Sequence, residues 1–299
     1  MRNTLYALTN ELKRLKAAGV HSVSVDASGI DRLRLAITQN KKLSQQTSTA
    51  RPSPKLGDID ESSKQLLGNV EPGSLLPIPP KIKLPEGDKK TRWQALRELV
   101  INDEICLKQV RPGMPVVFGV GDIDAKVMFV GEAPGAEEET SGEPFVGPAG
   151  QLLTKMIGAM GLSRETVYIG NIMKWRPQII PNSKGGQIGN RPPTLEEMQY
   201  CLPFLSAQIE IVDPQLIVAL GSTAAHGLLG DKAFATLGEV RGKWHEFGGK
   251  PLMVTYHPSY ILRNKTNRSK RMIWEDLLLV MERVSLPISD KQRGFFLNR

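Results

Sequence analysis

The chain has 299 residues, 40% of them apolar and 23% charged, a composition ordinary for a folded protein rather than a disordered or fibrous one. Its 39 Lys and Arg residues exceed its 31 Asp and Glu residues, and the formal net charge of +8 favours a polyanionic partner, with nucleic acid as the first candidate. The two cysteines cannot form a disulfide framework, and no apolar run approaches the ~20 residues that cross a bilayer. We therefore expect a cytoplasmic, monomeric protein that does not bind membranes.

The first 90 residues predict a small module followed by a linker. Leucines at three- and four-residue steps within residues 3–19 are typical of one helix face, and residues 1–40 are expected to form a small, mostly helical N-terminal module. Residues 41–90 hold seven of the 21 prolines and no aromatic residue. Such a stretch buries too little apolar area to offset its ordering entropy. We interpret it as a flexible linker, of which residues 75–84 are the part best suited to dock on another surface.

An alternation of helices and strands begins at Thr91 and predicts an α/β domain over residues 91–299. Apolar runs separated by helices indicate a three-layer αβα arrangement around a central, mainly parallel four-stranded sheet. A long helix from Thr194 to Val212 begins with a capping box, because Glu197 follows Thr194 by three residues. Ligands of such sheets bind beyond the carboxyl ends of the strands. The strands are expected at residues 126–131, 167–172, 216–220 and 252–256.

Two motifs follow the first of these strands. A tight turn begins at Gly131 and Glu132 and continues into an acidic run at residues 137–139. Taken alone, it is as consistent with an ordinary turn and a solvated acidic run as with a functional site. Phe145 stands in a loop just before a helix with a glycine-rich start. Its ring is either a core residue or a platform on which a nucleobase stacks.

The second and fourth strands also end in unusual residues. Asn171 offers both a hydrogen-bond donor and an acceptor, the pattern that reads a nucleobase edge, although a capped turn would explain it equally simply. After the fourth strand, Pro258 fixes the imidazole of His257, and two apolar residues at 261–262 precede Arg263. An apolar wedge beside a cation suits a protein that unstacks a base pair while gripping a phosphate. The alternative is the first turn of a helix whose apolar side faces the core.

These motifs, together with residues 143–153, 171–177, 190–193, 240–244 and 257–260, resemble the family-four uracil-DNA glycosylases from about Phe118 to Val280, in order and at family spacing. The resemblance implies a DNA repair enzyme whose partner is uracil-containing DNA. Such an enzyme flips uracil out of the helix and hydrolyses its N-glycosidic bond, which releases free uracil and leaves an abasic site. We expect DNA contacts from Arg241, Lys243, Ser259, Ile261, Leu262 and Arg263.

Catalysis of this kind needs donors aimed at the base oxygens and a positioned water near the sugar C1′ atom. His257 is expected to donate to uracil O2 as a neutral imidazole. By resemblance, Asn171 reads the uracil edge, Phe145 stacks on the ring, and backbone amides around Ala133 and Gly135 hold a carbonyl oxygen.

Glu132 is expected to complete the catalytic set with Asn171 and His257. It either orients and activates the water or stabilises the positively charged sugar, and the sequence leaves both roles open.

Two other classes of protein are alternatives to an enzyme. A protein that binds uracil in DNA with weak or no turnover would need the same recognition residues. A nucleotide-binding α/β protein is disfavoured because Glu132 and the acidic run would repel a phosphate.

The chain departs from the family at the cysteines. The family normally carries a [4Fe-4S] cluster, which needs four cysteine ligands. The corresponding positions are Glu104, Leu107, Trp175 and Cys201, of which only the last is a cysteine, while Cys106 stands alone beside the first two. We therefore predict that the cluster and any other cofactor are absent, and that Trp175 fills the volume of the cluster with apolar packing. A second departure is an insertion at residues 179–189.

Overall fold

The computed structural model describes residues 76–179 and 189–297. The predicted N-terminal module at residues 1–40, most of the predicted linker and most of the insertion at 179–189 lie outside the described residues. None of the helices in the described part of the chain is long and apolar enough to span a membrane.

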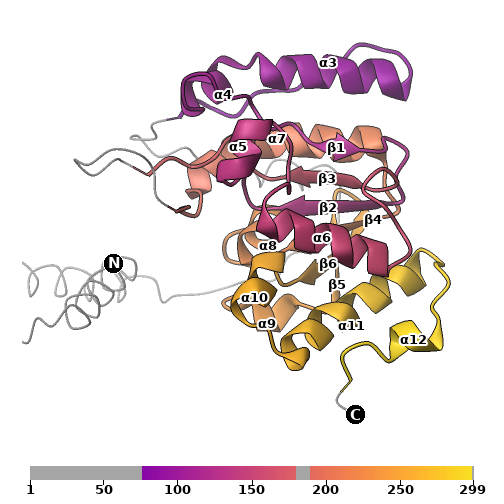
Figure 1. Ribbon diagram of the computed structural model, residues 1–299. Coiled ribbons are helices and arrows are strands. Elements are labelled where there is room, and N and C mark those ends of the chain that lie inside the picture. Colours follow the sequence, from indigo (N-terminus) through magenta and orange to yellow (C-terminus); the bar gives the residue numbers. More distant parts are fainter. Residues whose placement is uncertain (1–75, 180–188, 298–299) are drawn as a thin grey trace, which may run out of the picture. The chain divides into compact units, whose positions relative to one another are not determined.

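A six-stranded mixed sheet forms the centre of the domain (Figure 1). In spatial order its strands are β1 (Val120–Gly121), β3 (Tyr168–Asn171), β2 (Val127–Gly131), β4 (Leu216–Leu220), β6 (Lys250–Thr255) and β5 (Trp244–Phe247). The four central strands are parallel, and they are the four that the apolar runs predict. The prediction of a four-stranded sheet is nevertheless wrong in number, because β1 and β5 add one antiparallel strand at each edge.

The two edge strands lack the sequence signal of the central ones. Every residue of β2 and of β4 is buried, which is why both read as unbroken apolar runs. β1 is only two residues long, and β5 is partly exposed along its length. β5 turns back into β6 through Gly248 and Gly249, both with positive φ, and this pair is a hairpin signal that the sequence does contain.

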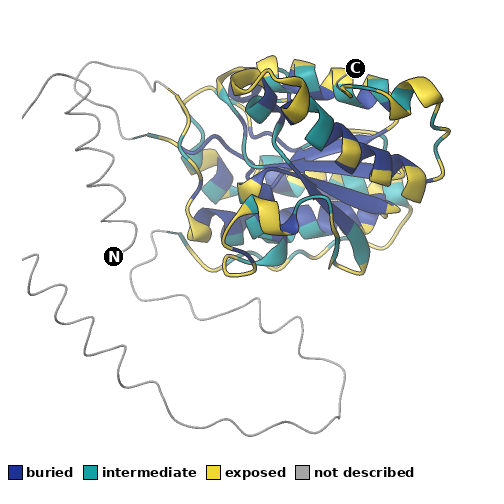
Figure 2. Ribbon diagram, turned by 90° about the horizontal axis from the view of Figure 1, so that it is seen from below, coloured by how far each residue is buried: buried dark blue, intermediate teal, exposed yellow. Residues whose placement is uncertain are grey.

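Helices cover both faces of the sheet, which gives the three layers expected (Figures 1 and 2). Along β2, Met128 and Val130 pack into one core while Val127 and Phe129 pack into the other, as alternation along a strand requires. The helices of the first core are α3 (Lys89–Ile101), α4 (Glu104–Gln109), α7 (Leu195–Val212) and α8 (Ser222–Leu229). Those of the second are α6 (Pro148–Ala159), α10 (Pro258–Arg263) and α11 (Asn267–Arg283). Short helices in the connections are α5 (Ala136–Ser141), α9 (Leu237–Val240) and α12 (Asp290–Arg293).

Local signals explain where several of these segments begin. The predicted capping box of α7 is present, with the Thr194 side chain accepting from the Glu197 amide at 3.2 Å and the Glu197 carboxylate accepting from the Thr194 amide at 2.7 Å. Residues 76–88, the described part of the chain before α3, form no helix or strand, but Leu76, Ile82 and Leu84 pack against the first core. This part of the predicted linker therefore docks on the domain as expected.

Candidate active site

Three of the residues predicted to carry the chemistry follow strands of the parallel part of the sheet. Glu132 comes directly after β2, Asn171 is the last residue of β3, and His257 lies two residues beyond β6. Because these strands are parallel, their carboxyl ends share one edge of the sheet. The fold therefore brings the three side chains to the same edge.

Two side chains of the site lie directly against the backbone of Gly131. It pairs in register with Asn171, and a Cβ atom on Gly131 would lie 2.4 Å from Asn171 Oδ1 and 2.4 Å from Phe145 Cζ. Real Cβ atoms do not approach other heavy atoms this closely. The glycine at the end of β2 thus allows the Phe145 ring and the Asn171 amide to meet over the backbone.

Asn171 is nearly inaccessible, with 3% of its surface exposed. Its Oδ1 atom has no hydrogen-bond partner among the described residues. A buried acceptor without a partner is costly, at about 1–3 kcal/mol, and such atoms often belong to sites that bind a ligand. The amide is therefore available to a donor on a bound molecule.

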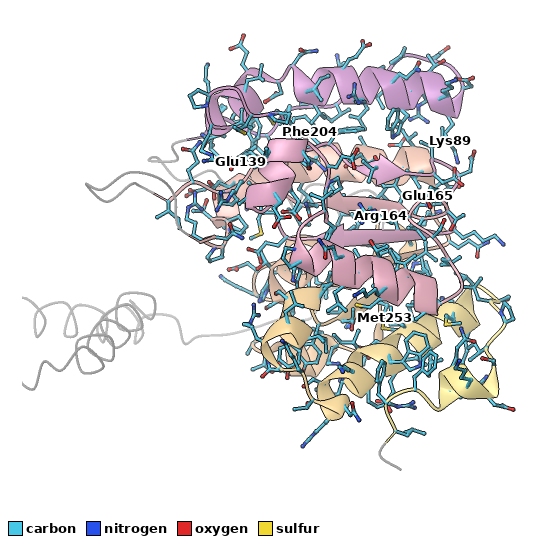
Figure 3. The ribbon with its side chains drawn as sticks, in the orientation of Figure 1. Lys89, Glu139, Arg164, Glu165, Phe204 and Met253 are labelled. Carbon is cyan, nitrogen blue, oxygen red and sulfur yellow. The ribbon has the colours of Figure 1, made fainter. Side chains whose placement is uncertain are left out.

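The Phe145 loop is held in an unusual backbone conformation. Phe145 has φ of 55°, and its ring centroid lies 5.7 Å from that of the His257 imidazole. Arg164, which is labelled in Figure 3, donates to the carbonyl oxygens of Phe145 at 3.0 Å and Pro144 at 2.8 Å. A Cβ atom on Gly150 would lie 1.8 Å from the Phe145 carbonyl oxygen, so the glycine-rich start of α6 allows the loop to fold back on the helix. Arg164 was not predicted from the sequence, because its partners lie 19 and 20 residues away and no local pattern indicates the contact.

Glu138 joins the two loops that follow β2. Its carboxylate accepts from the backbone amides of Gly135 at 3.0 Å, Val146 at 3.0 Å and Gly147 at 2.9 Å. The Gly135 amide, predicted to hold a uracil carbonyl, is thus engaged within the protein. Glu138 was also missed, although its place three residues after Gly135 at a helix start is the pattern of a residue that reaches back to the helix N-terminus.

The acidic run is not the solvated stretch that one interpretation expected. Glu139 is 1% exposed and pairs with Arg176 at 3.2 Å and with Arg111 at 2.5 Å (Figure 3). Arg176 also donates to the Asn190 side chain at 2.9 Å. Helix α5 turns Glu138 and Glu139 inward while Glu137 is exposed, so two of the three carboxylates belong to the folded interior.

His257 caps α10 and has a defined tautomer. Its Nδ1 atom accepts from the backbone amide of Ser259 at 3.2 Å and lies 2.8 Å from Ser259 Oγ. Because a backbone amide can only donate, Nδ1 is unprotonated and the proton of the neutral ring is on Nε2. Burial lowers the pKa of His257 to about 4, and the nearby positive charge of Arg263 acts in the same direction. The imidazole is therefore an uncharged donor at neutral pH.

Glu132 is partly buried, and this burial raises the pKa of its carboxyl group above the usual value, while a hydrogen bond with Thr223 of α8 opposes the shift. Its backbone carbonyl accepts from the Met173 amide at 3.0 Å, and that of Gly131 accepts from the Ile172 amide at 3.0 Å. The turns after β2 and β3 are thus tied to each other, which fixes Glu132 relative to the end of β3.

The residues of α10 that are predicted to contact DNA differ in their exposure. Leu262 is 39% exposed, whereas Ile261 is 7% exposed and packs in the second core, so its burial contradicts the predicted role as part of an exposed wedge. Ile261 faces inward because α10 packs with α6 in the second core, as the alternative interpretation expected. Arg263 is exposed, and its guanidinium donates to Ser259 Oγ at 3.2 Å.

The two cations in the segment before β5 have different surroundings. Arg241 donates to the buried carboxylate of Asp276 at 2.6 Å and to the Met272 carbonyl at 2.6 Å. Lys243 is bound through its ammonium only to the carbonyl of Glu239, at 2.8 Å, among the contacts of the described chain. Arg241 is thus committed to internal partners, while the side chain of Lys243 is exposed.

The residues at the predicted cluster position do not fit a [4Fe-4S] cluster. Cys106 and Cys201 are fully buried, and a hydrogen bond with Cys201 together with burial raises the pKa of the Cys106 thiol. Trp175 is 1% exposed and packs against Tyr200, with ring centroids 6.2 Å apart. Within residues 76–179 and 189–297, no three Cys, His, Asp or Glu side chains are grouped to hold a metal ion. Four thiolates are required, and the chain contains two cysteines.

The comparisons with known proteins agree with this geometry. A family model described as the uracil DNA glycosylase superfamily matches residues 118–278. The chain is 47% identical to the type-4 uracil-DNA glycosylase of Thermotoga maritima over 54% of this chain and 79% of that protein. It is 45% identical to that of Archaeoglobus fulgidus over 48% of this chain and 70% of that protein. A type-5 uracil-DNA glycosylase of Pyrobaculum aerophilum is 30% identical over 55% of this chain and 73% of that protein. The chain belongs to the uracil DNA glycosylase superfamily.

Proposed function

We propose that this protein removes uracil from DNA by hydrolysing its N-glycosidic bond, which leaves an abasic site, and that residues 91–299 carry this activity. One observation supports the proposal above the others. The unpartnered Asn171 amide, the Phe145 ring and the neutral His257 imidazole converge at one edge of the sheet around Gly131. A base taken out of the stack needs an aromatic platform, an amide for its edge and a donor for its departing charge.

Asn171 accounts for the choice of base. Its Oδ1 atom accepts from the uracil N3–H, while its amide nitrogen donates to uracil O4. Cytosine presents an unprotonated N3 atom and an amino group to the same amide, so both contacts become repulsive. Because Asn171 is buried, such a mismatch costs binding free energy: the unpaired polar atoms cannot form hydrogen bonds with water instead.

His257 and Glu132 account for the bond cleavage. As the bond from C1′ to the base nitrogen breaks, the base becomes an anion and the sugar becomes positively charged. The Nε2–H of His257 donates to uracil O2, and this hydrogen bond strengthens as negative charge develops. Glu132 must be ionised, whether it orients the attacking water or stabilises the sugar cation. The turn after β2 is predicted to hold a carbonyl oxygen of uracil. Its candidate donor is the backbone amide near Ala133, because the amide of Gly135 already donates to Glu138.

Removing the imidazole separates an enzyme from a protein that merely binds uracil-containing DNA. We expect His257→Ala to lower the single-turnover rate of uracil release about a hundredfold to a thousandfold while DNA affinity stays nearly intact, because the donor acts chiefly in the transition state. Lys243→Ala is the matched control, which should weaken binding and flatten its salt dependence without changing the rate at saturation. Single-turnover assays and binding isotherms at fixed salt measure both. A His257→Ala variant that binds poorly but cleaves normally once saturated would contradict this role.

The charge state of His257 can be measured directly. Because burial lowers its pKa to about 4, the imidazole stays neutral as the pH falls from 8 to 5 and gains a proton only around pH 4. Imidazole ¹⁵N NMR should therefore show the Nε2-protonated tautomer throughout this range, with the assignment made by comparison with His257→Ala. A titration midpoint near the ordinary value for histidine, about 6.5, would show that the ring is charged in weakly acidic solution and that the neutral-donor mechanism is wrong.

The exposed Leu262 is proposed to act as the wedge that opens the duplex. Leu262→Ala should reduce uracil release from double-stranded DNA about tenfold more than from single strands, since only the duplex must be unstacked. Ile261→Val is the control on the same helix, where the lost methyl group belongs to the core and should cost about 0.5–1.5 kcal/mol of stability with no preference for duplex substrates. Equal losses on both substrates for Leu262→Ala would rule out intercalation.

We also propose that the chain folds and acts without an iron–sulfur cluster. Trp175 and Tyr200 occupy the region with apolar packing, beside the two buried thiols. Protein purified without oxygen, so that a labile cluster would survive, should be colourless, free of bound iron and active in uracil release. The measurements are the visible absorption spectrum and the iron content. A brown preparation with about four iron atoms per chain would contradict this proposal.

A further inference from the structure

Lys174 is a buried cation that the proposed mechanism does not use. Its side chain is fully buried, and none of the ion pairs in the described part of the chain includes it. Its ammonium instead donates to the Asn171 carbonyl at 3.0 Å, to the Gln208 side chain of α7 at 2.6 Å and to the Phe118 carbonyl at 3.4 Å. Three hydrogens thus meet three neutral acceptors. A buried charge without an opposite charge is costly to stability, so its contribution should be sought in what it holds.

What Lys174 holds is the end of β3. Its own carbonyl accepts from the Val117 amide at 2.8 Å, and its ammonium reaches back three residues to the Asn171 carbonyl. The segment from Asn171 to Lys174 is therefore wrapped around the ammonium and fastened to the chain before β1 and to α7. The backbone at Gly119 also packs closely against this group, because a Cβ atom there would lie 3.1 Å from Gln208 Nε2.

The aim of the Asn171 amide depends on this backbone. Its Oδ1 atom has no partner among the described residues that would hold the side chain from its far end. The position of the amide is then set by the backbone at residue 171 and by the close contact over Gly131. A displacement of about 1 Å in a group that aligns a substrate can reduce a rate a hundredfold.

We propose that Lys174 is a positioning residue for uracil recognition, which acts by fixing the backbone of Asn171 through its buried ammonium. This inference rests on the proposed function, since it assigns the amide of Asn171 to uracil. The competing explanation is that Lys174 only stabilises the core in which Trp175 and the two thiols lie. The two explanations differ in whether the effect of Lys174 requires the Asn171 side chain.

A double-mutant cycle distinguishes them. Lys174→Met keeps the apolar stem and removes the charge. On DNA containing uracil, it should lower the single-turnover rate about tenfold to a hundredfold. In an Asn171→Ala background the same change should cause little further loss, because there is no amide left to position. Affinity for DNA that already contains an abasic site, which offers no base to Asn171, should stay unchanged.

Tyr168→Phe is the matched control. The Tyr168 hydroxyl is bonded to Gln208 at 3.1 Å and to Trp93 at 3.3 Å, so Tyr168 shares Gln208 with Lys174 and lies on the strand that ends at Asn171. It makes no hydrogen bond to the Asn171 carbonyl. This variant should therefore disturb the core while leaving the rate within about twofold of the unaltered chain, well inside the effect of a misaligned substrate group.

Each outcome bears on the proposal. Equal losses from Lys174→Met with and without the Asn171 side chain, or no loss at all, would overturn it in favour of a purely structural role. Should Lys174→Met fail to fold in thermal melts, Lys174→Gln, which retains a neutral donor, carries the same cycle with an expected partial loss. Failure of the proposed function looks different, since Asn171→Ala would then release uracil as fast as the unaltered chain, and the inference would fall with it.

Discussion

The close approach over Gly131 is the constraint on which the rest of the site depends. With no side chain at the end of β2, the Phe145 ring and the Asn171 amide share the space that a Cβ atom would fill. This contact requires the in-register pairing of Gly131 with Asn171 and the left-handed backbone of Phe145. The proposed geometry of base recognition therefore depends both on the register of the sheet and on the fold of the loop before α6. A larger residue at 131 would disturb all of them at once.

Buried and half-buried charges maintain that geometry, and each acts on the backbone of a site segment. Glu138 accepts from three amides in the two loops after β2, Arg164 donates to the two carbonyls at Phe145, and Lys174 donates to the carbonyl of Asn171. Charged groups removed from water seldom add net stability, but they are directional and sensitive to loss. Their placement around the proposed substrate-binding residues favours a role in alignment.

The parts of the fold that could be predicted are those whose signal is local. Apolar runs identify the four central strands, because burial on both faces removes any alternation, and the capping box at Thr194 identifies the start of α7. Position after a strand singled out Glu132, Asn171 and His257 as candidates, and the family resemblance supplied their predicted roles. What could not be predicted depends on partners distant in sequence. Glu139 looks solvated until Arg111 and Arg176 are brought to it, and Ile261 looks like a wedge until α10 turns it toward the core.

The same burial shifts the two reacting groups in opposite directions, and this sets the working state of the site. Removal from water disfavours charge, so it lowers the pKa of His257 and raises that of Glu132. Neutral His257 is the form that fits the Ser259 amide, and ionised Glu132 is the form that a cationic sugar requires. Both forms coexist only at a pH above the raised pKa of Glu132. Acidification therefore affects the carboxylate while the imidazole stays neutral down to about pH 4. Loss of activity in weak acid would be assigned to Glu132, and the donor to uracil would still be in place.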